Sequence, residues 1–166
     1  MISRNITTVI SELNQWGNLN SATTFLVKNF CELFDWSYGE VWSPSVDGKF
    51  MKWSGYWANN QNYFLKFSKF SSIHKFGMGI GLIGKTWQEK KSLCIDDIFA
   101  DNNFLRTEVA VQSDLKAAVC IPVLDKEKVL CILCFFMTTL TVEDKTKAGE
   151  IYNHSNEIGE ALAQLL

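Results

Sequence analysis

The sequence has little of what marks several large classes of protein. It holds two prolines and two histidines in 166 residues, and its 16 Lys and Arg are slightly outnumbered by 18 Asp and Glu. The formal net charge of −2 argues against a nucleic-acid surface, which needs clustered positive charge. No apolar run is long enough to span a bilayer, and no secretory leader opens the chain. We therefore expect a cytoplasmic protein with no nucleic-acid partner and no membrane insertion.

Recognisable catalytic and metal-binding patterns are also missing. The two histidines, His74 and His154, lie far from any Cys and lack metal-ligand spacing. The chain shows no Ser/His/Asp or Cys/His arrangement and no spaced pair of catalytic carboxylates. We therefore expect no metal site and no catalytic residues, and predict that the chain is not an enzyme.

One nucleotide-binding pattern is formally present. The GxxxxGK[ST] match runs from Gly79 to Thr86, but a phosphate-binding loop needs a buried parallel strand before it and a long helix after it. Neither is indicated here, so we interpret the match as accidental. We expect the glycines of this run to let a turn pass close to a sheet.

The five cysteines are odd in number and scattered. They are Cys31, Cys94, Cys120, Cys131 and Cys134. Most lie among apolar residues, which favours reduced, buried side chains that act as small hydrophobic groups. Cys131 and Cys134 have CxxC spacing, but residues three apart in a strand point to opposite faces. We therefore predict neither a redox pair nor a metal pair from this spacing.

The first third of the chain changes from helical to strand periodicity. An apolar stripe predicts an N-terminal helix thin enough to be an interface seam rather than a core face: Ile2, Ile6, Val9, Leu13 and Trp16. A second helix is expected from about Asn20 to Phe34. Alternation then predicts strands at Tyr38–Trp42 and Phe50–Trp57, and a weaker pattern predicts a third at Phe64–Ser71.

The rest of the chain predicts a long connection, a hairpin and one long helix. The loop-rich connection Phe76–Pro122 is of the kind that closes over a pocket. Leu115–Val123 and Val129–Met137 predict two central strands. A capping box at Thr141 opens a predicted helix to the chain end, with a heptad-like seam that stops in mid-pattern, as in a piece of a longer protein.

This order predicts a single α+β domain over residues 1–166, with helices on one face of an antiparallel sheet. Residues 1–35 would form the N-terminal helices, 36–137 the sheet and pocket connection, and 141–166 a C-terminal signalling helix.

The sequence resembles a GAF domain, a small-molecule sensor module. Four spaced segments carry the resemblance, which covers essentially the whole chain: Gly79–Trp87, Leu93–Asp97, Asp101–Arg106 and Leu115–Pro122. The resemblance implies a GAF-like (profilin/PAS-like) six-stranded antiparallel sheet with a lidded pocket on one face. On the other face it implies N- and C-terminal helices that pair across a homodimer.

Specialised GAF chemistries find little support. Bilin-binding members carry a Cys in the helix before the strand that ends in Pro, and Phe104–Asp114 has none, so a covalent bilin is not expected. Haem-binding members need an axial His, and only His74 lies near the pocket. The cyclic-nucleotide signature is not intact. The free methionine sulfoxide reductases of this fold use cysteines around the pocket loops, a pattern that Cys94 and Cys120 lack.

The expected ligand site combines aromatic, glycine-loop and charged residues. The candidates are Trp53, Trp57, Phe70, Gly79, Ile80, Trp87, Ile95, Asp97, Phe104 and Arg106. The acidic group of Asp96, Asp97 and Asp101 favours turn and cap bonding over ligand binding. Arg106 would pair with these carboxylates or with an anionic ligand.

We therefore expect a regulatory ligand-binding domain of a larger signalling protein, such as a histidine kinase, cyclase or transcription regulator. Its terminal helices would relay pocket occupancy to an output module. The alternatives are a ligand-free dimerisation module with a pocket filled by its own aromatics, and a redox enzyme that uses Cys94 or Cys120. The cofactor, if any, is unknown.

Overall fold

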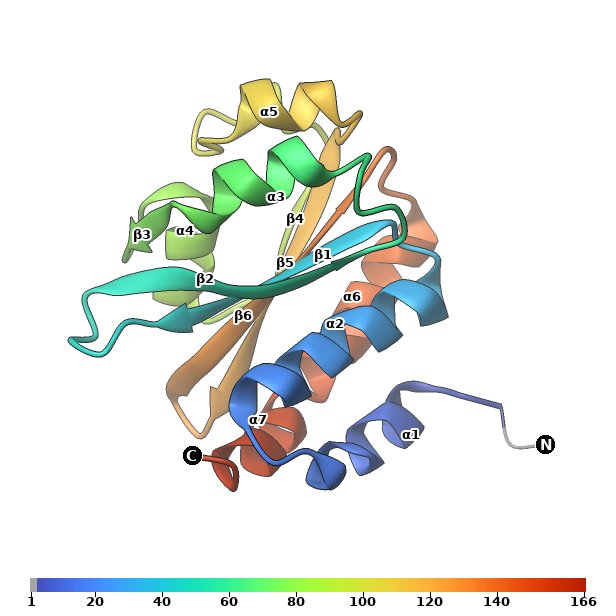
Figure 1. Ribbon diagram of the computed structural model, residues 1–166, viewed down its shortest axis with the longest axis vertical. Coiled ribbons are helices and arrows are strands. Elements are labelled where there is room, and N and C mark those ends of the chain that lie inside the picture. The colour runs from blue at the N-terminus through green and yellow to red at the C-terminus, as the bar shows by residue number, and fades with distance from the viewer. Residues whose placement is uncertain (1–2) are drawn as a thin grey trace.

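The computed structural model describes residues 3–166 and shows one antiparallel sheet with helices on both faces (Figure 1). The strands are β1 (Tyr38–Pro44), β2 (Phe50–Ala58), β3 (Lys75–Gly77), β4 (Leu93–Ile95), β5 (Ala117–Asp125) and β6 (Lys128–Met137). The helices are α1 (Ile6–Ser11), α2 (Leu19–Phe34), α3 (Leu65–Ser72), α4 (Gly81–Glu89), α5 (Thr107–Gln112), α6 (Val142–Asn153) and α7 (Ser155–Ala163), with a 3-10 turn η1 (Leu13–Gln15).

The sheet has six strands in the order β3-β2-β1-β6-β5-β4, all paired antiparallel. β1 and β6 are central, and β5 and β6 form the hairpin that the apolar runs predict. The six-stranded α+β architecture expected from the resemblance is therefore confirmed.

Two separate apolar cores lie on the two faces of the sheet. One face packs against α1, α2, α6 and α7, and the other packs against α3, α4 and α5 (Figure 1). Cys131 belongs to the first core and Cys134 to the second. This confirms that the CxxC spacing places its two sulfurs on opposite faces. We call the face that carries α3, α4 and α5 the pocket face.

The predicted third strand, Phe64–Ser71, was wrong, because this segment forms α3. Its buried residues are Phe64, Phe67, Ser68 and Ser71. These positions recur at i, i+3, i+4 and i+7, which is one face of a helix. The apparent alternation arose from exposed Lys66 and half-exposed Phe70 on the outer side.

A β-bulge in β2 changes the predicted facing of its tryptophans. The register with β1 shifts between Val41, which pairs with Gly55, and Trp42, which pairs with Trp53. Because one extra residue sits in β2 here, the alternation inverts. Trp53 packs on the pocket face, whereas Trp57 packs against the core of the terminal helices.

The predicted single C-terminal helix is divided in two at His154. Just after the break, the buried Ser155 hydroxyl donates to the Pro122 carbonyl at 2.6 Å and accepts from the Leu124 amide at 3.0 Å. These bonds fasten α7 to β5 at the bulge between Val123 and Leu124. The break therefore lets the last helix pack on the sheet.

The apolar stripes of the terminal helices are core, not free interface seams. Ile6, Val9 and Leu13 of the N-terminal stripe are buried, while Trp16 remains 37% exposed and Ile2 lies outside the described residues. In the C-terminal seam, the residues Ala148, Ile151, Ser155, Ile158 and Leu162 are all buried. The burial of Ile6, Val9 and Leu13 corrects the expectation that the N-terminal stripe is an interface seam.

Over residues 3–166, every helix is too short or too polar to traverse a lipid bilayer.

Candidate functional site

A fully buried ion pair lies at the centre of the pocket face. Arg106, just before α5, points down onto the sheet and meets Glu40 of β1. Its Nη1 donates to both carboxylate oxygens, at 2.8 and 2.9 Å, and to the Ser71 hydroxyl of α3 at 2.7 Å. The side chains of the pair are 1% and 0% exposed. Two charges without water need this dense set of partners.

Two neighbours on the same strand complete the bonding of the carboxylate. The Tyr38 hydroxyl donates to Glu40 at 3.0 Å and the Trp42 indole donates at 2.9 Å. Burial, and then the Glu40 charge, raise the pKa of Tyr38 well above its ordinary value, so the hydroxyl remains a donor. β1 thus presents Tyr38, Glu40 and Trp42 on one face by simple alternation.

Aromatic rings surround the guanidinium. The centre of the Arg106 guanidinium lies 5.1 to 5.8 Å from five ring centroids, those of Trp42, Phe67, Phe76, Phe104 and Phe136. Such rings stabilise a cation through their negative faces and exclude water. The pocket face at this point is therefore filled by the protein's own side chains.

Two buried donors on this face lack an acceptor. Glu40 accepts four hydrogen bonds, two on each oxygen. Among the described residues, the buried side-chain nitrogens without any partner are Arg106 Nη2 and Trp53 Nε1. A buried donor without an acceptor costs about 1–3 kcal/mol. The site consequently lacks an acceptor next to Arg106.

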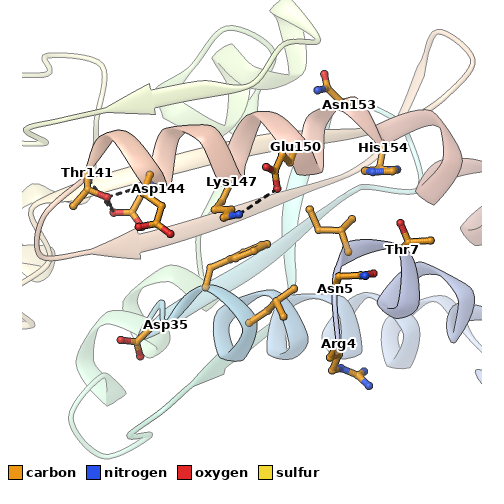
Figure 2. Close-up of a pocket in the computed structure, with 14 residues that line it drawn as sticks. Arg4, Asn5, Thr7, Asp35, Thr141, Asp144, Lys147, Glu150, Asn153 and His154 are labelled. Carbon is orange, nitrogen blue, oxygen red and sulfur yellow. Dashed lines mark hydrogen bonds and ion pairs between the residues drawn. The ribbon is translucent and has the colours of Figure 1, made fainter. Parts of the chain in front are cut away.

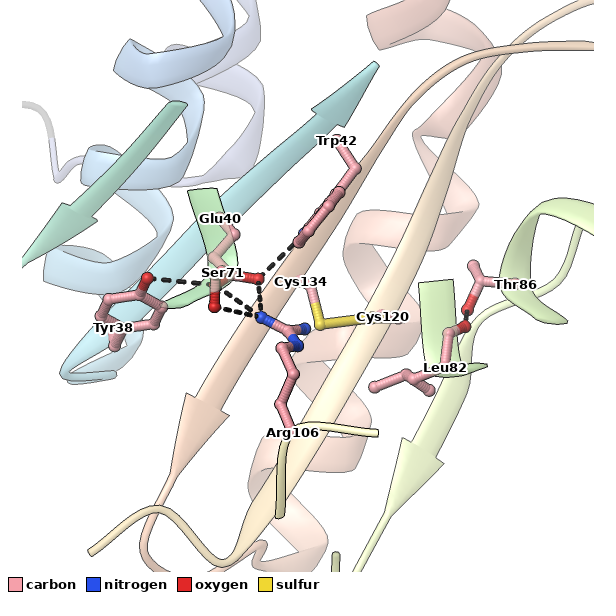
Figure 3. The surroundings of a disulfide bond; sticks show 9 residues. All are labelled: Tyr38, Glu40, Trp42, Ser71, Leu82, Thr86, Arg106, Cys120 and Cys134. Atoms are coloured by element: carbon pink, nitrogen blue, oxygen red, sulfur yellow. Dashed lines mark hydrogen bonds and ion pairs between the residues drawn. A yellow bond between two sulfur atoms is a disulfide. The ribbon is translucent and has the colours of Figure 1, made fainter. Parts of the chain in front are cut away.

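A disulfide joins Cys120 of β5 to Cys134 of β6 on this same face. Figure 3 shows the guanidinium of Arg106 pointing toward this disulfide, with Leu82 and Thr86 of α4 on its other side. The prediction that all cysteines are reduced was wrong for this pair, because the two residues face each other in the β5–β6 register. Cys31, Cys94 and Cys131 remain free thiols.

The surface above the ion pair is hollowed between α3 and α5. The cleft measures about 620 Å³ and is lined by Lys66, Lys69, Phe70, Ile73, Leu105, Arg106, Glu108, Val109 and Gln112. Its walls are mainly apolar, and Lys66, Lys69 and Glu108 supply the charges at its rim. Arg106 belongs both to this cleft and to the buried ion pair, so it connects the surface with the core.

The ten predicted site residues are partly brought together. Phe70 and Arg106 line the α3–α5 cleft, and Phe104 packs below it. Trp53, Trp87 and Ile95 lie in the pocket-face core, while Gly79 and Ile80 lie in the loop before α4. Trp57 is on the opposite face, and Asp97 is an exposed turn residue whose carboxylate accepts from the Phe99 amide at 2.9 Å.

The acidic group has the capping and pairing roles that its sequence favoured. Asp101 accepts from the Asn103 amide at 2.8 Å, and Asp96 pairs with Lys145 of α6 at 2.9 Å. Arg106 does not join these carboxylates. It pairs instead with Glu40, which is 66 residues away in the chain.

The glycine run at the start of α4 serves close packing, in line with the interpretation of the P-loop match as accidental. Gly79 and Gly81 have positive φ angles of 81° and 67°, which other residues rarely adopt. A Cβ on Gly84 would overlap the carbonyl oxygen of Gly77. These glycines therefore let α4 begin directly against β3.

Sequence reasoning missed Glu40, Ser71 and Cys134. Glu40 was one polar residue in an otherwise apolar stretch from Tyr38 to Trp42, and a carboxylate at that inward position signals a buried partner. Ser71 was hidden by the wrong strand prediction. The Cys120–Cys134 pairing needs the hairpin register, which the turn Asp125–Lys128 sets.

A second hollow of about 820 Å³ lies on the opposite side of the molecule. Figure 2 shows α6 on one side of it and the N-terminal segment and α2 on the other. Most of its lining is polar: Arg4, Asn5, Thr7, Asp35, Thr141, Glu143, Asp144, Lys147, Glu150, Asn153 and His154. Within residues 3–166, no cluster of three His, Cys, Asp or Glu side chains has the geometry to hold a metal ion.

Comparisons with known proteins were made by sequence and by structure. No protein-family model matches the sequence, and no curated protein matches it. The fold, however, is similar to that of the GAF domain of a phosphoenolpyruvate-protein phosphotransferase from Coxiella burnetii. The TM-score is 0.75 at 17% identity, with 95% of this chain and 90% of that chain covered.

Enzymes share this fold. The free methionine-R-sulfoxide reductase of Neisseria meningitidis matches with a TM-score of 0.72 at 14% identity, over 96% of this chain and 89% of that chain. The type II enzyme of Thermoplasma acidophilum matches at 0.65 and 9% identity, over 93% and 97%. This finding overturns the prediction that the chain is not an enzyme, because proteins with catalytic activity have the same architecture.

Together, the strand order, the helices on both faces and these structural matches give one conclusion. The chain has the fold of a GAF domain.

Proposed function

We propose that this chain is a sensory domain that binds a small molecule in the α3–α5 cleft and passes the binding event to an output module. The observation that carries the proposal is the double position of Arg106, which lines the cleft and holds the buried Glu40 pair. Ligand pockets typically combine apolar walls with a few polar groups. The cleft has this composition, with Phe70, Leu105 and Val109 beside Lys66 and Lys69.

Transmission would run through the sheet. A ligand that moves the start of α5 also moves Arg106, and with it the Glu40 carboxylate on β1. On the other side of β1, Val41 packs in the core formed with the terminal helices. Because packed cores switch between discrete arrangements rather than deform smoothly, a shift of β1 would reposition α2.

The proposed partners are a second copy of the chain and an output domain such as a kinase, cyclase or transcription-regulator module. The outward surfaces of the N-terminal segment and α2 would form the contact between copies. Trp16 and Phe25 lie there with ring centroids 5.3 Å apart, beside a hollow of about 800 Å³.

The decisive experiment is native mass spectrometry of the purified domain, followed by denaturing extraction of any bound molecule. We expect the wild type to carry a small molecule that extraction releases. Leu105→Glu places a charge in the cleft wall and should abolish the added mass. Val111→Glu is the matched control, because Val111 is similarly exposed on α5 (49% against 54%) but does not line the cleft.

A bare protein that no metabolite panel stabilises against heat would contradict the ligand-binding proposal. That outcome would favour a dimerisation module whose pocket face is filled by Trp42, Phe67 and their neighbours. Equal loss of the added mass in Leu105→Glu and Val111→Glu would place the ligand elsewhere.

A further inference from the structure

The strand registers place three functional side chains in one row on the pocket face. Glu40 of β1 is opposite Cys134 of β6, and Cys134 is opposite Cys120 of β5. Laterally paired residues on one face have Cβ atoms about 4.5–5.5 Å apart. A carboxylate and two sulfurs are thus immediate neighbours on three adjacent strands.

Arg106 covers this row from above. Its Nη1 bonds the carboxylate end of the row, while Nη2 has no acceptor. Figure 3 shows the guanidinium directed toward the two sulfurs. A disulfide sulfur is a poor hydrogen-bond acceptor, whereas a thiolate is an anion that a guanidinium stabilises well.

We propose that Cys120 and Cys134 form a thiol–disulfide redox centre whose reduced form is stabilised by Arg106. In the disulfide state Nη2 is unpaired, as observed. In the reduced state one sulfur is a thiolate that accepts from Nη2 and fills the missing acceptor position. This inference goes beyond ligand sensing and does not depend on the α3–α5 cleft being occupied.

The co-reactant is a dithiol, and the exchange is balanced. A thiolate of the dithiol attacks one cysteine sulfur, the Cys120–Cys134 bond breaks, and a mixed disulfide forms. The second thiol of the reagent then attacks its own mixed-disulfide sulfur and closes a reagent disulfide. Two electrons and two protons pass to the cysteines, and one cysteine releases its proton to solvent. The reverse steps re-form the bond. Both sulfurs are buried, so exchange requires a movement of the helices above them.

The charged groups around the pair are defined. Glu40 and Tyr38 face it from β1 and Arg106 from the position just before α5, whereas α4 contributes Leu82 and Thr86 (Figure 3). Glu40 opposes a thiolate and Arg106 favours it. Two variants therefore separate the two effects. Glu40→Gln removes the opposing charge, and the double variant Glu40→Gln/Arg106→Gln removes both.

The other three cysteines should contribute little thiolate to the measured signal at neutral pH. Desolvation raises the pKa of Cys31 well above its usual value, raises that of Cys131 to about 12, and also raises that of Cys94. A thiolate detected near pH 7 would thus arise from Cys120 or Cys134. The matched control is Cys120→Ser/Cys134→Ser, which retains the three silent thiols.

The test has two readouts on the full chain. Mass spectrometry of unfolded, alkylated protein first establishes whether Cys120 and Cys134 escape alkylation until dithiothreitol is added. The ultraviolet absorbance of thiolate is then followed against pH in dithiothreitol-reduced protein. We expect a thiolate step in the wild type below the ordinary cysteine pKa of about 8.5. The step should be absent in Cys120→Ser/Cys134→Ser.

The double variant differs from Glu40→Gln only by the Arg106 charge. It should therefore hold at least ~10-fold less thiolate than Glu40→Gln at the Glu40→Gln midpoint, since a neighbouring opposite charge lowers a pKa by about 1–3 units. Glu40→Gln should shift the step to lower pH, and it decides the matter if the double variant does not fold. Both cysteines alkylated without dithiothreitol, no wild-type step below about 8.5, or a step that neither variant moves would each overturn the proposal. Because no arm uses the cleft, failure here is distinct from failure of ligand binding.

Discussion

At the scale of single residues, Arg106 determines how the pocket face is organised. Its guanidinium satisfies Glu40, contacts five aromatic rings and keeps one nitrogen toward the sulfur pair. No other charged pair among residues 3–166 is comparably enclosed, since the remaining ion pairs have side chains at least 32% exposed. Exposed pairs contribute about 0–1 kcal/mol to stability. Among these ion pairs, we therefore expect the Glu40–Arg106 pair to have the largest effect on stability when one partner is removed.

Removal of one partner should cost far more than removal of both. Arg106→Met leaves the Glu40 carboxylate buried without its counter-charge, and we expect a loss of about 3–5 kcal/mol in the free energy of unfolding. Glu40→Gln/Arg106→Met removes the unpaired charge and should recover a large part of that loss. Urea denaturation of both variants measures the difference. A double variant as unstable as Arg106→Met would show that packing, rather than charge, accounts for the loss.

At the scale of elements, the start of α6 is fastened to the segment just before β1. Thr141 and Asp144 form the predicted capping box, with the Thr141 amide donating to Asp144 at 2.9 Å and the Asp144 amide donating to Thr141 at 3.1 Å. The Trp36 indole also donates to the Asp144 carboxylate, at 2.9 Å. Burial opposes the charged form, but the backbone, indole and hydroxyl donors outweigh it and lower the pKa of Asp144.

This lowered pKa predicts a pH-dependent contribution to stability. The Asp144 contribution is present above the unfolded aspartate pKa of about 3.9 and is lost as the pH falls through the lower, folded value. Asp144→Asn should therefore be less stable than the wild type at neutral pH, and the two unfolding midpoints should converge on acidification. Thermal melts across this range measure the convergence. A constant difference down to the most acidic pH would contradict the assignment.

The junction between α7 and β5 depends on one hydroxyl. Ser155→Ala leaves the buried Leu124 amide without its acceptor and the Pro122 carbonyl without its donor. We expect a loss of about 1–3 kcal/mol, together with faster hydrogen exchange at Leu124. Ser72→Ala is the control, because that hydroxyl is exposed and bonds only within its own helix. Equal effects in the two variants would be inconsistent with a special role for Ser155.

At the scale of the whole molecule, the terminal helices use most of their apolar surface inside the domain. Among residues 3–166, the exposed large aromatic side chain on that side is Trp16, whose ring is tilted against that of Phe25. If a second copy binds there, as proposed, Trp16→Asp should weaken dimerisation by about 2 kcal/mol, roughly 30-fold. Val46→Asp, in an exposed turn, should leave it unchanged. Sedimentation analysis of the three proteins gives the constants. A monomeric wild type would rule out this contact.

The sequence by itself determined the class of fold and most of its elements. The strands β1, β2, β5 and β6, the helix α2 and the capping box of α6 follow from local patterns, because alternation, helical periodicity and turn residues act over a few neighbours. The spaced motifs from Gly79 to Pro122 indicated a GAF-like pocket face before any contact was known.

Only the tertiary structure decided the chemistry of the site. The Glu40–Arg106 pair joins residues 66 apart, and the Cys120–Cys134 disulfide depends on hairpin register. One bulged residue in β2 sent Trp57 to the opposite face, and the last helix is divided at His154, next to the Ser155 bonds to β5. A shift of one residue in register inverts which side chains share a face. Such shifts arise from packing across the whole sheet, so no local pattern could reveal them.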